Sequence, residues 1–238
     1  MHYKRTVYLA ILFTLIITPG FTQDISSVAF QERIDSLRKV LPSMEVVADS
    51  LESKGIIYYR HFDLDTAQAY FTHVLQIRED IQSDKINKSY LYLGAIAARQ
   101  EEYKLSIPLF KKAMELSIGV DTVRLGQAYN NLGLSFGHMD ELDSALKYHK
   151  MSLALKNSLA LNEVSLESIN VTLNNLGLTY LKKDDHDSAL YYFNIVLEQT
   201  KDNEDQTEYA NALNNIGYIN YLKKNNDDAL QGYKGALK

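Results

Sequence analysis

The sequence predicts an all-α protein built as a solenoid of about five stacked helix-turn-helix repeats. A glycine recurs at a nearly constant spacing, a small side chain follows each glycine twelve positions later, and a ring follows sixteen positions later. The glycines are Gly55, Gly94, Gly133, Gly177 and Gly217, the small residues are Ala67, Ser106, Ala145, Ala189 and Ala229, and the rings are Phe71, Phe110, His149, Phe193 and Tyr233. Self-similarity at a period of this length indicates supersecondary units that stack on one another.

The segment 128–155 shows how one repeat is built. Its apolar residues return every three or four positions, which predicts two amphipathic helices joined near 137–143. Gly133 falls in the middle of the first helix, where glycine costs roughly 1 kcal/mol relative to alanine. Because the same glycine recurs in every repeat, we expect a neighbouring helix to approach the backbone closely there. Ala145 allows the same approach from the second helix, and the ring of His149, one turn later, fills the space between units.

Three segments carry a further resemblance. The sequences YNNLGLSF (129–136), LNNLGLTY (173–180) and LNNIGYINY (213–221) resemble the first helix of the tetratricopeptide repeat, and DSALKYHKMSLAL, DSALYYFNIVL and DDALQGYKGAL resemble its second helix. The resemblance covers about 48–238 and implies a right-handed α-solenoid, with repeats near 48–81, 87–120, 126–159, 170–203 and 210–238. The spacing exceeds the usual period of this family, as in the longer repeats of kinesin light chains, and we expect longer helices to take up the surplus.

Residues 1–22 have the layout of a secretory signal peptide. A basic start is followed by an apolar run over residues 6–18 and then by Pro19 and Gly20. A helix over this run would span only ~20 Å, short of the ~30 Å hydrocarbon core of a membrane. We therefore expect cleavage near residue 22 and export, to the periplasm of a bacterial cell. The alternative is a membrane anchor through residues 6–18.

The segment 24–43 predicts a separate N-terminal helix. Ser26 or Ser27 can cap it, its apolar residues recur at helical spacing from Phe30 to Leu41, and Pro42 ends it. A helix of this kind is expected to cover the first repeat, because the end unit of a solenoid otherwise leaves an apolar face uncovered.

Composition and motifs exclude several classes of function. The formal net charge is −5 and the pI is near 5.7, whereas a nucleic-acid-binding surface is normally basic. The chain has no cysteine, so it forms no disulfide. The sequence shows no glycine-rich phosphate loop, nucleophile elbow or zinc-binding helix motif. We therefore predict a protein that is not an enzyme and that holds no cofactor and no metal.

Two groups of side chains favour a structural role over a chemical one. Residues 182–190 bring Asp184, Asp185, His186 and Asp187 together, but they fall at a turn between helices, where acidic residues cap the next helix. His149 takes the position that an aromatic ring occupies in the other repeats, which predicts a packing histidine.

Pairs of asparagine mark the candidate binding site. They recur just before the repeat glycine in three consecutive first helices, although asparagine is a mediocre helix former. The pairs are Asn130 and Asn131, Asn174 and Asn175, and Asn214 and Asn215. An amide offers donors and an acceptor to the backbone of an extended peptide, and the resemblance implies that first helices line a concave surface where such asparagines hold a peptide. The alternative is that the second asparagine of each pair bonds to the adjacent repeat.

Neighbouring first-helix positions add Lys182 and Tyr218 to this site and suit an acidic or aromatic peptide ligand. The predicted function is thus a non-catalytic scaffold in the bacterial envelope that binds a protein or peptide, serving as the sensory input region of a signalling protein. The alternative is a stand-alone structural adaptor. Because 226–238 ends inside a second helix, we also expect that the natural chain continues or that this end self-associates.

Overall fold

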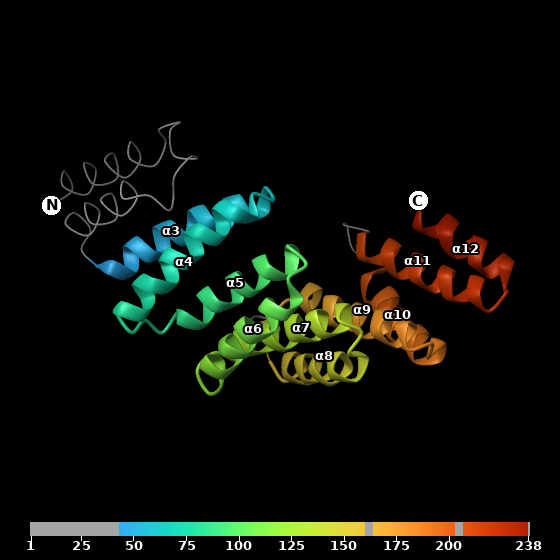
Figure 1. Cartoon of the computed structure of the whole chain (residues 1–238). Helices are drawn as coiled ribbons and strands as arrows, with labels where there is room; N and C mark the ends of the chain where they lie inside the picture. Colours follow the sequence, from blue (N-terminus) through green and yellow to red (C-terminus); the bar gives the residue numbers. More distant parts are fainter. Residues whose placement is uncertain (1–42, 160–163, 203–206, 238) are drawn as a thin grey trace. The chain divides into compact units, whose positions relative to one another are not determined.

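The computed structural model describes residues 43–159, 164–202 and 207–237 (Figure 1). Ten α-helices and no strand form these residues, in agreement with the predicted all-α solenoid. The predicted signal peptide (1–22) and, except for Ser43, the predicted capping helix (24–43) lie outside the described residues. In the part that the structure describes, no helix is both long enough and apolar enough to cross a membrane.

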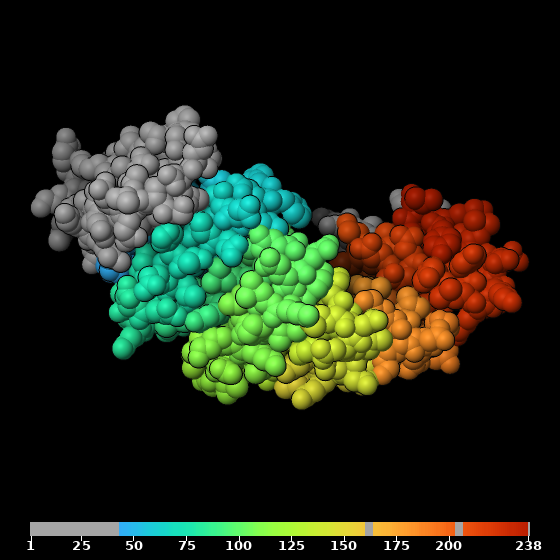
Figure 2. Space-filling model, in the orientation of Figure 1, coloured from blue at the N-terminus to red at the C-terminus, as the bar shows by residue number. Residues whose placement is uncertain are grey.

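The chain divides into two compact units, 1–102 and 103–238. The described part of the first unit contains α3 (Met44–Arg60), α4 (Leu64–Asp80) and α5 (Ile86–Arg99). The second unit contains α6 (Tyr103–Ser117), α7 (Thr122–His138), α8 (Leu142–Asn157), α9 (Leu166–Lys182), α10 (His186–Thr200), α11 (Thr207–Leu222) and α12 (Asn226–Ala236). In the second unit each helix packs on the next one along the chain (Figure 2). The predicted repeats begin one to four residues after the starts of the helices α3, α5, α7, α9 and α11.

Three of the repeat glycines lie directly under the ring of their own repeat, whereas the sequence predicts only that a neighbouring helix approaches them. A Cβ atom added at Gly133 would lie 2.5 Å from the His149 ring, and one added at Gly177 would lie 2.6 Å from the Phe193 ring. Gly55 faces Phe71 in the same way. No side chain fits at these positions, so the close approach expected between the two helices of a repeat is confirmed. The rings of Phe71, Phe110, His149 and Phe193 and the small residues Ala67, Ser106, Ala145 and Ala189 are fully buried or nearly so.

The turn after each first helix has one recurring geometry. The residue seven positions after the repeat glycine has a positive φ, between 61° and 63°, in all five turns: Phe62, Glu101, Asp140, Asp184 and Lys224. The next residue donates its backbone N–H to a carbonyl near the end of the preceding helix, as Asp185 does to Tyr180. This is the Schellman arrangement, which satisfies the free carbonyls at a helix end.

The acidic turn at 184–187 caps a helix. The Asp185 carboxylate accepts a hydrogen bond from the Ser188 backbone N–H at the start of α10, as predicted. The expectation of longer helices holds only in part. The residues that exceed the usual repeat length between the third and fourth repeats lie largely in a connection. Helix α8 ends at Asn157, and α9 begins at Leu166 after the cap Ser165.

Candidate functional site: a hollow lined by three first helices

The asparagine pairs connect consecutive repeats. Asn175 donates its side-chain N–H to the Oδ1 of Asn130 at 3.1 Å, and Asn215 donates in the same way to Asn174 at 3.1 Å. The second amide of one repeat therefore bonds to the first amide of the repeat before it. Asn130 and Asn175 are 7% and 8% exposed, so the first of these bonds is sealed from water.

The remaining amides have no such partner. Asn131 is half-buried and Asn214 is exposed, and no side chain or backbone group of the described residues hydrogen-bonds to either amide. The geometry of Asn175 and Asn215 is the bond to the adjacent repeat that the sequence left open as an alternative. Their contact with a peptide stays a prediction.

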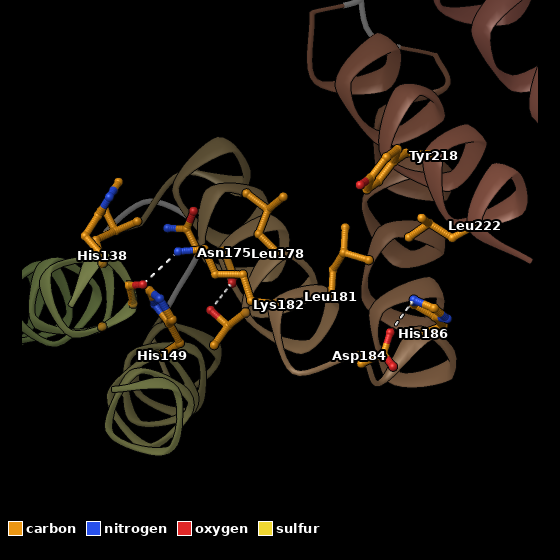
Figure 3. A pocket seen from close by; sticks show the side chains of 14 residues that line it. His138, His149, Asn175, Leu178, Leu181, Lys182, Asp184, His186, Tyr218 and Leu222 are labelled. Atoms are coloured by element: carbon orange, nitrogen blue, oxygen red, sulfur yellow. Dashed lines mark hydrogen bonds and ion pairs between the residues drawn. The ribbon is translucent and has the colours of Figure 1, made fainter. Parts of the chain in front are cut away.

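A hollow of about 410 Å³ opens beside these hydrogen-bonded asparagines in the second unit (Figure 3). Two equivalent positions of α7, α9 and α11 line it: the residue directly after the repeat glycine and the residue one helical turn later. We call these the first and second groove positions. In α7, α9 and α11 the first position is Leu134, Leu178 and Tyr218, and the second is His138, Lys182 and Leu222. Residues four apart lie on one helix face, so the two side chains of each helix face the hollow together. We call each such pair a rung.

The wall of the hollow is largely apolar and open to water. Leu134, Leu178 and Tyr218 are 37%, 39% and 46% exposed, and Leu222 is 40% exposed. Figure 3 shows Leu178 and Leu181 on one side of the space and Tyr218 and Leu222 on the other. Single exposed apolar residues are ordinary, but a row of them inside a concave surface is typical of a binding site.

Polar groups lie at the edge of the hollow. The Lys182 ammonium donates to the backbone carbonyl of Gly137 at 2.8 Å, so it bridges the end of α7 to α9. The His138 ring stacks on Tyr103 with centroids 4.5 Å apart. At the opposite edge of the hollow, the His186 Nε2 and Asp184 Oδ1 atoms lie 3.1 Å apart. The edge is thus able to hydrogen-bond to a polypeptide backbone or to polar side chains.

The base of the hollow is uncharged at neutral pH. His149 is 1% exposed, and burial, together with the charge of Lys156, lowers its pKa to about 4. Its Nδ1 atom has no hydrogen-bond partner among the described residues, and the ring packs directly against Gly133. The predicted packing histidine is confirmed.

The structure therefore brings three of the eight predicted site residues into one hollow. Asn175, Lys182 and Tyr218 line it, and Asn130 lies behind Asn175 as its hydrogen-bond acceptor. Asn131, Asn174, Asn214 and Asn215 are not among the lining residues. Within residues 43–159, 164–202 and 207–237, no three His, Cys, Asp or Glu side chains gather as a metal site would require.

The sequence did not predict that Leu134, Leu178 and Leu222 line the hollow. A signal for the first groove position was present, because the residue after each repeat glycine is apolar in all five repeats: Ile56, Ala95, Leu134, Leu178 and Tyr218. An apolar residue beside a glycine reads as core, and only the structure shows that these side chains face water.

Comparison with known proteins supports the repeat architecture. A tetratricopeptide repeat family model matches residues 85–158 and 168–238, more than half of the chain. No curated protein matches the sequence. Among solved structures, BtubC (BKLC) from P. vanneervenii matches with a TM-score of 0.73 and 16% identity, over 86% of this chain and 84% of that one.

Two further structures are similar at low identity. A Rap protein complexed with Competence and Sporulation Factor matches with a TM-score of 0.69 and 12% identity, over 87% of this chain and 57% of that one. YrrB, a TPR protein with an unusual peptide-binding site, matches with a TM-score of 0.53 and 20% identity, over 80% and 84% of the two chains. The glycine frame, the helix pairs and the family match lead to one conclusion: the chain belongs to the tetratricopeptide repeat family.

Proposed function

We propose that this protein is a non-catalytic scaffold that binds an extended segment of another polypeptide in the hollow of its second unit. The observation that carries the proposal is the row of exposed apolar side chains at the first groove position of α7, α9 and α11. Burying them on folding would have been favourable, yet each stays exposed on a concave surface. A bound segment with bulky apolar side chains would cover them.

The dimensions suit an extended ligand. Packed helices lie ~8–10 Å apart, and an extended chain advances ~3.3 Å per residue, so a bound segment would meet a new rung about every third residue. Lys182, His138 and the amides beside the hollow would bond to its backbone or polar groups. The Rap protein, complexed with Competence and Sporulation Factor, and YrrB, with its unusual peptide-binding site, are in keeping with this use of the fold.

Selection of binding peptides from a random library displayed on phage, with the full chain as target, tests the proposal. Tyr218→Ala and Leu178→Ser should each weaken the selected peptides by about tenfold, because each removes roughly 1.4 kcal/mol or more of apolar contact. The matched controls are Tyr191→Ala and Leu230→Ser, since these exposed residues lie on the second helices α10 and α12. If the control variants lose as much affinity as the hollow variants, the binding site lies elsewhere.

Export and signalling belong to the same proposal. The layout of residues 1–22 supports secretion to the periplasm, and a scaffold there would act as the input region of a sensor or, as the second candidate, as an adaptor in an envelope assembly. N-terminal sequencing of the protein made in a Gram-negative host measures this directly. We expect a new N-terminus near residue 23, and intact Met1 in the membrane fraction would instead support the anchor through residues 6–18.

A further inference from the structure

The two halves of the hollow differ in chemistry. Between α9 and α11 the side chains of Leu178 and Leu181 face those of Tyr218 and Leu222 across the space (Figure 3). The half between α7 and α9 is richer in hydrogen-bonding groups, which are supplied by His138, Asn175, Thr179 and Lys182. The hollow therefore joins an apolar half to a polar half.

The apolar half is exposed for want of a partner within the fold. Leu178, Tyr218 and Leu222 are each about two-fifths exposed. Leu181 is half-buried, because it also packs against the core cluster that contains Phe193 and Ile219. A bulky apolar side chain placed between α9 and α11 would cover all four residues and remove their apolar surface from water. An aromatic side chain would in addition stack on the Tyr218 ring.

The lysine and the carboxylate that line the hollow are already engaged, and both lie outside its apolar half. The Lys182 ammonium donates to the Gly137 carbonyl between α7 and α9. The Asp184 carboxylate lies beside His186, and its side chain is 91% exposed, so it is in water at the edge. A charged side chain between Leu181 and Tyr218 would lose its hydration without gaining an opposite charge, which is unfavourable.

The charges next to the hollow do not favour an acidic ligand. Lys183 pairs with Asp143, and Lys223 pairs with Asp187, so these lysines are neutralised by neighbouring turns. Over the three turns at 139–143, 182–187 and 223–228, acidic residues outnumber basic ones. Of the two ligand classes that the sequence suits, acidic and aromatic, the surroundings of the hollow favour the aromatic one.

We propose that the half of the hollow between α9 and α11 is a specificity pocket, which accepts one bulky apolar side chain of the bound segment and rejects charged ones. The proposal rests on the proposed function and names its ligand class: a segment of another polypeptide that is uncharged where it crosses the hollow and carries a leucine, methionine or aromatic residue there. That residue lies between Leu181 and Tyr218, and the adjoining backbone bonds to the polar groups between α7 and α9.

Sequencing the peptides that the full chain selects from the phage library is the first test. Among the peptides that Leu178→Ser weakens, one position should be leucine, methionine or aromatic throughout, with no charged residue on either side of it. If Leu178→Ser and Tyr218→Ala weaken none of the selected peptides, the proposed function fails and the specificity pocket fails with it. If they weaken peptides that carry a charged residue at the shared position, the pocket alone is overturned.

An exchange of charge is the second test. A synthetic peptide whose shared apolar residue is replaced by glutamate should bind the parent protein at least about tenfold more weakly than the original peptide. Tyr218→Lys should weaken the original peptide by about tenfold and strengthen the glutamate peptide by about tenfold, because the new ammonium supplies the opposite charge. Leu178→Lys, on the opposite wall, should show the same exchange, so the test does not depend on the folding of one variant.

Tyr191→Lys is the matched control, because Tyr191 is a 62% exposed tyrosine on the second helix α10 and does not line the hollow. It should leave the affinity for both peptides within about twofold of the parent. The proposal is overturned if neither Tyr218→Lys nor Leu178→Lys strengthens the glutamate peptide, or if Tyr191→Lys strengthens it equally.

Discussion

The helix pairs α3–α4 and α7–α8 place a basic residue at the same point of the repeat and treat it in opposite ways. Arg78 and Lys156 lie at the same distance after their repeat glycines and are 0% and 4% exposed. Arg78 pairs with Glu45, Asp49 and Glu52, and also donates to Ser89. Among the described residues Lys156 has neutral partners alone, the Ser168 carbonyl at 2.7 Å and the Thr172 hydroxyl at 2.8 Å.

The difference lies in how each pair compensates for a buried charge. Around Arg78 the carboxylates of α3 are shared with Lys85, just before α5, and with Lys88 of α5, so positive and negative groups balance within the first unit. Around Lys156 no carboxylate of the described residues compensates the ammonium, and burial lowers its pKa to about 8. The same repeat position is thus a permanent ion pair in one unit and a titratable group near neutral pH in the other.

Removing Arg78 is the largest predicted effect. Arg78→Met would leave the Glu52 carboxylate, which is 5% exposed, with Lys88 as its remaining charged partner. Breaking a buried ion pair from one side costs about 3–5 kcal/mol, and denaturant unfolding at pH 7 measures the loss. Arg60→Met, an exposed arginine of the same helix α3, should change the stability by less than about 0.5 kcal/mol. A loss below about 1 kcal/mol in Arg78→Met would show that the balance of charges is not what holds α3 to α4.

Lys156 should give the second unit an alkaline gain in stability. Its pKa is about 8 in the folded chain against 10.5 for an unperturbed lysine, so between these values the unfolded state binds more protons than the folded state. Stability therefore rises with pH over this range, by up to about 3 kcal/mol for a shift of this size. Unfolding free energies of the parent and of Lys156→Met, compared at pH 7, 8, 9 and 10, isolate this contribution. Parallel pH profiles for the two proteins would contradict it.

His149 should have the corresponding effect on the acid side. Its pKa is about 4 in the folded chain against 6.5 for an unperturbed histidine, so stability is present above pH 6.5 and is lost as the pH falls toward 4. At pH 4.5 the loss should reach about 2 kcal/mol. His149→Phe gives this repeat the ring that Gly55 and Gly177 already face, and it should remove the acid loss. The reverse change, Phe193→His, should introduce such a loss, and its failure to do so would contradict the explanation.

Removing a hydrogen bond between asparagines of consecutive repeats has the smallest predicted effect. These bonds are specific to the second unit, because Ser53 and Tyr92 occupy the position of the second asparagine in the first unit. Asn175→Ala leaves the Asn130 acceptor buried without its donor, which costs about 1–2 kcal/mol, offset in part by the better helix propensity of alanine. Asn214→Ala is the control, since this exposed asparagine has no partner among the described residues. A double-mutant cycle of Asn130→Ala and Asn175→Ala measures their coupling, and an energy near zero would mean that the bond does not join the repeats.

The architecture could be predicted because its contacts repeat at fixed separations along the chain. Gly177 meets Phe193 and Gly133 meets His149, since a helix pair with the same short turn always brings the same two positions of the repeat together. The acidic cap Asp185 was predictable for a similar reason, since a cap bonds within its own helix turn. The family resemblance of the first-helix and second-helix sequences is confirmed by the match over 85–158 and 168–238.

The site was less predictable, because it depends on which faces of different repeats meet water. Lys182 and Tyr218 were predicted to lie together and do line one hollow, but Leu178 and Leu222 have the sequence pattern of core residues. Asn175 and Asn215 follow a pattern that fits both a peptide contact and a bond to the next repeat. Only the distance between helices that lie a whole repeat apart in the sequence distinguishes the two roles.

By itself, the sequence determined the all-α class, the repeat period, the close approach of helices at the repeat glycines and the acidic cap at 184–187, since each follows from local periodicity and short-range geometry. The tertiary structure decided which amides pair across repeats, which apolar residues line the hollow, and that Arg78 pairs with carboxylates whereas Lys156 bonds to neutral oxygens of the described residues. The physical reason is that exposure and the partners of a buried charge depend on helices that are distant in sequence. The spacing of residues within one repeat gives no information on how close such helices lie in space.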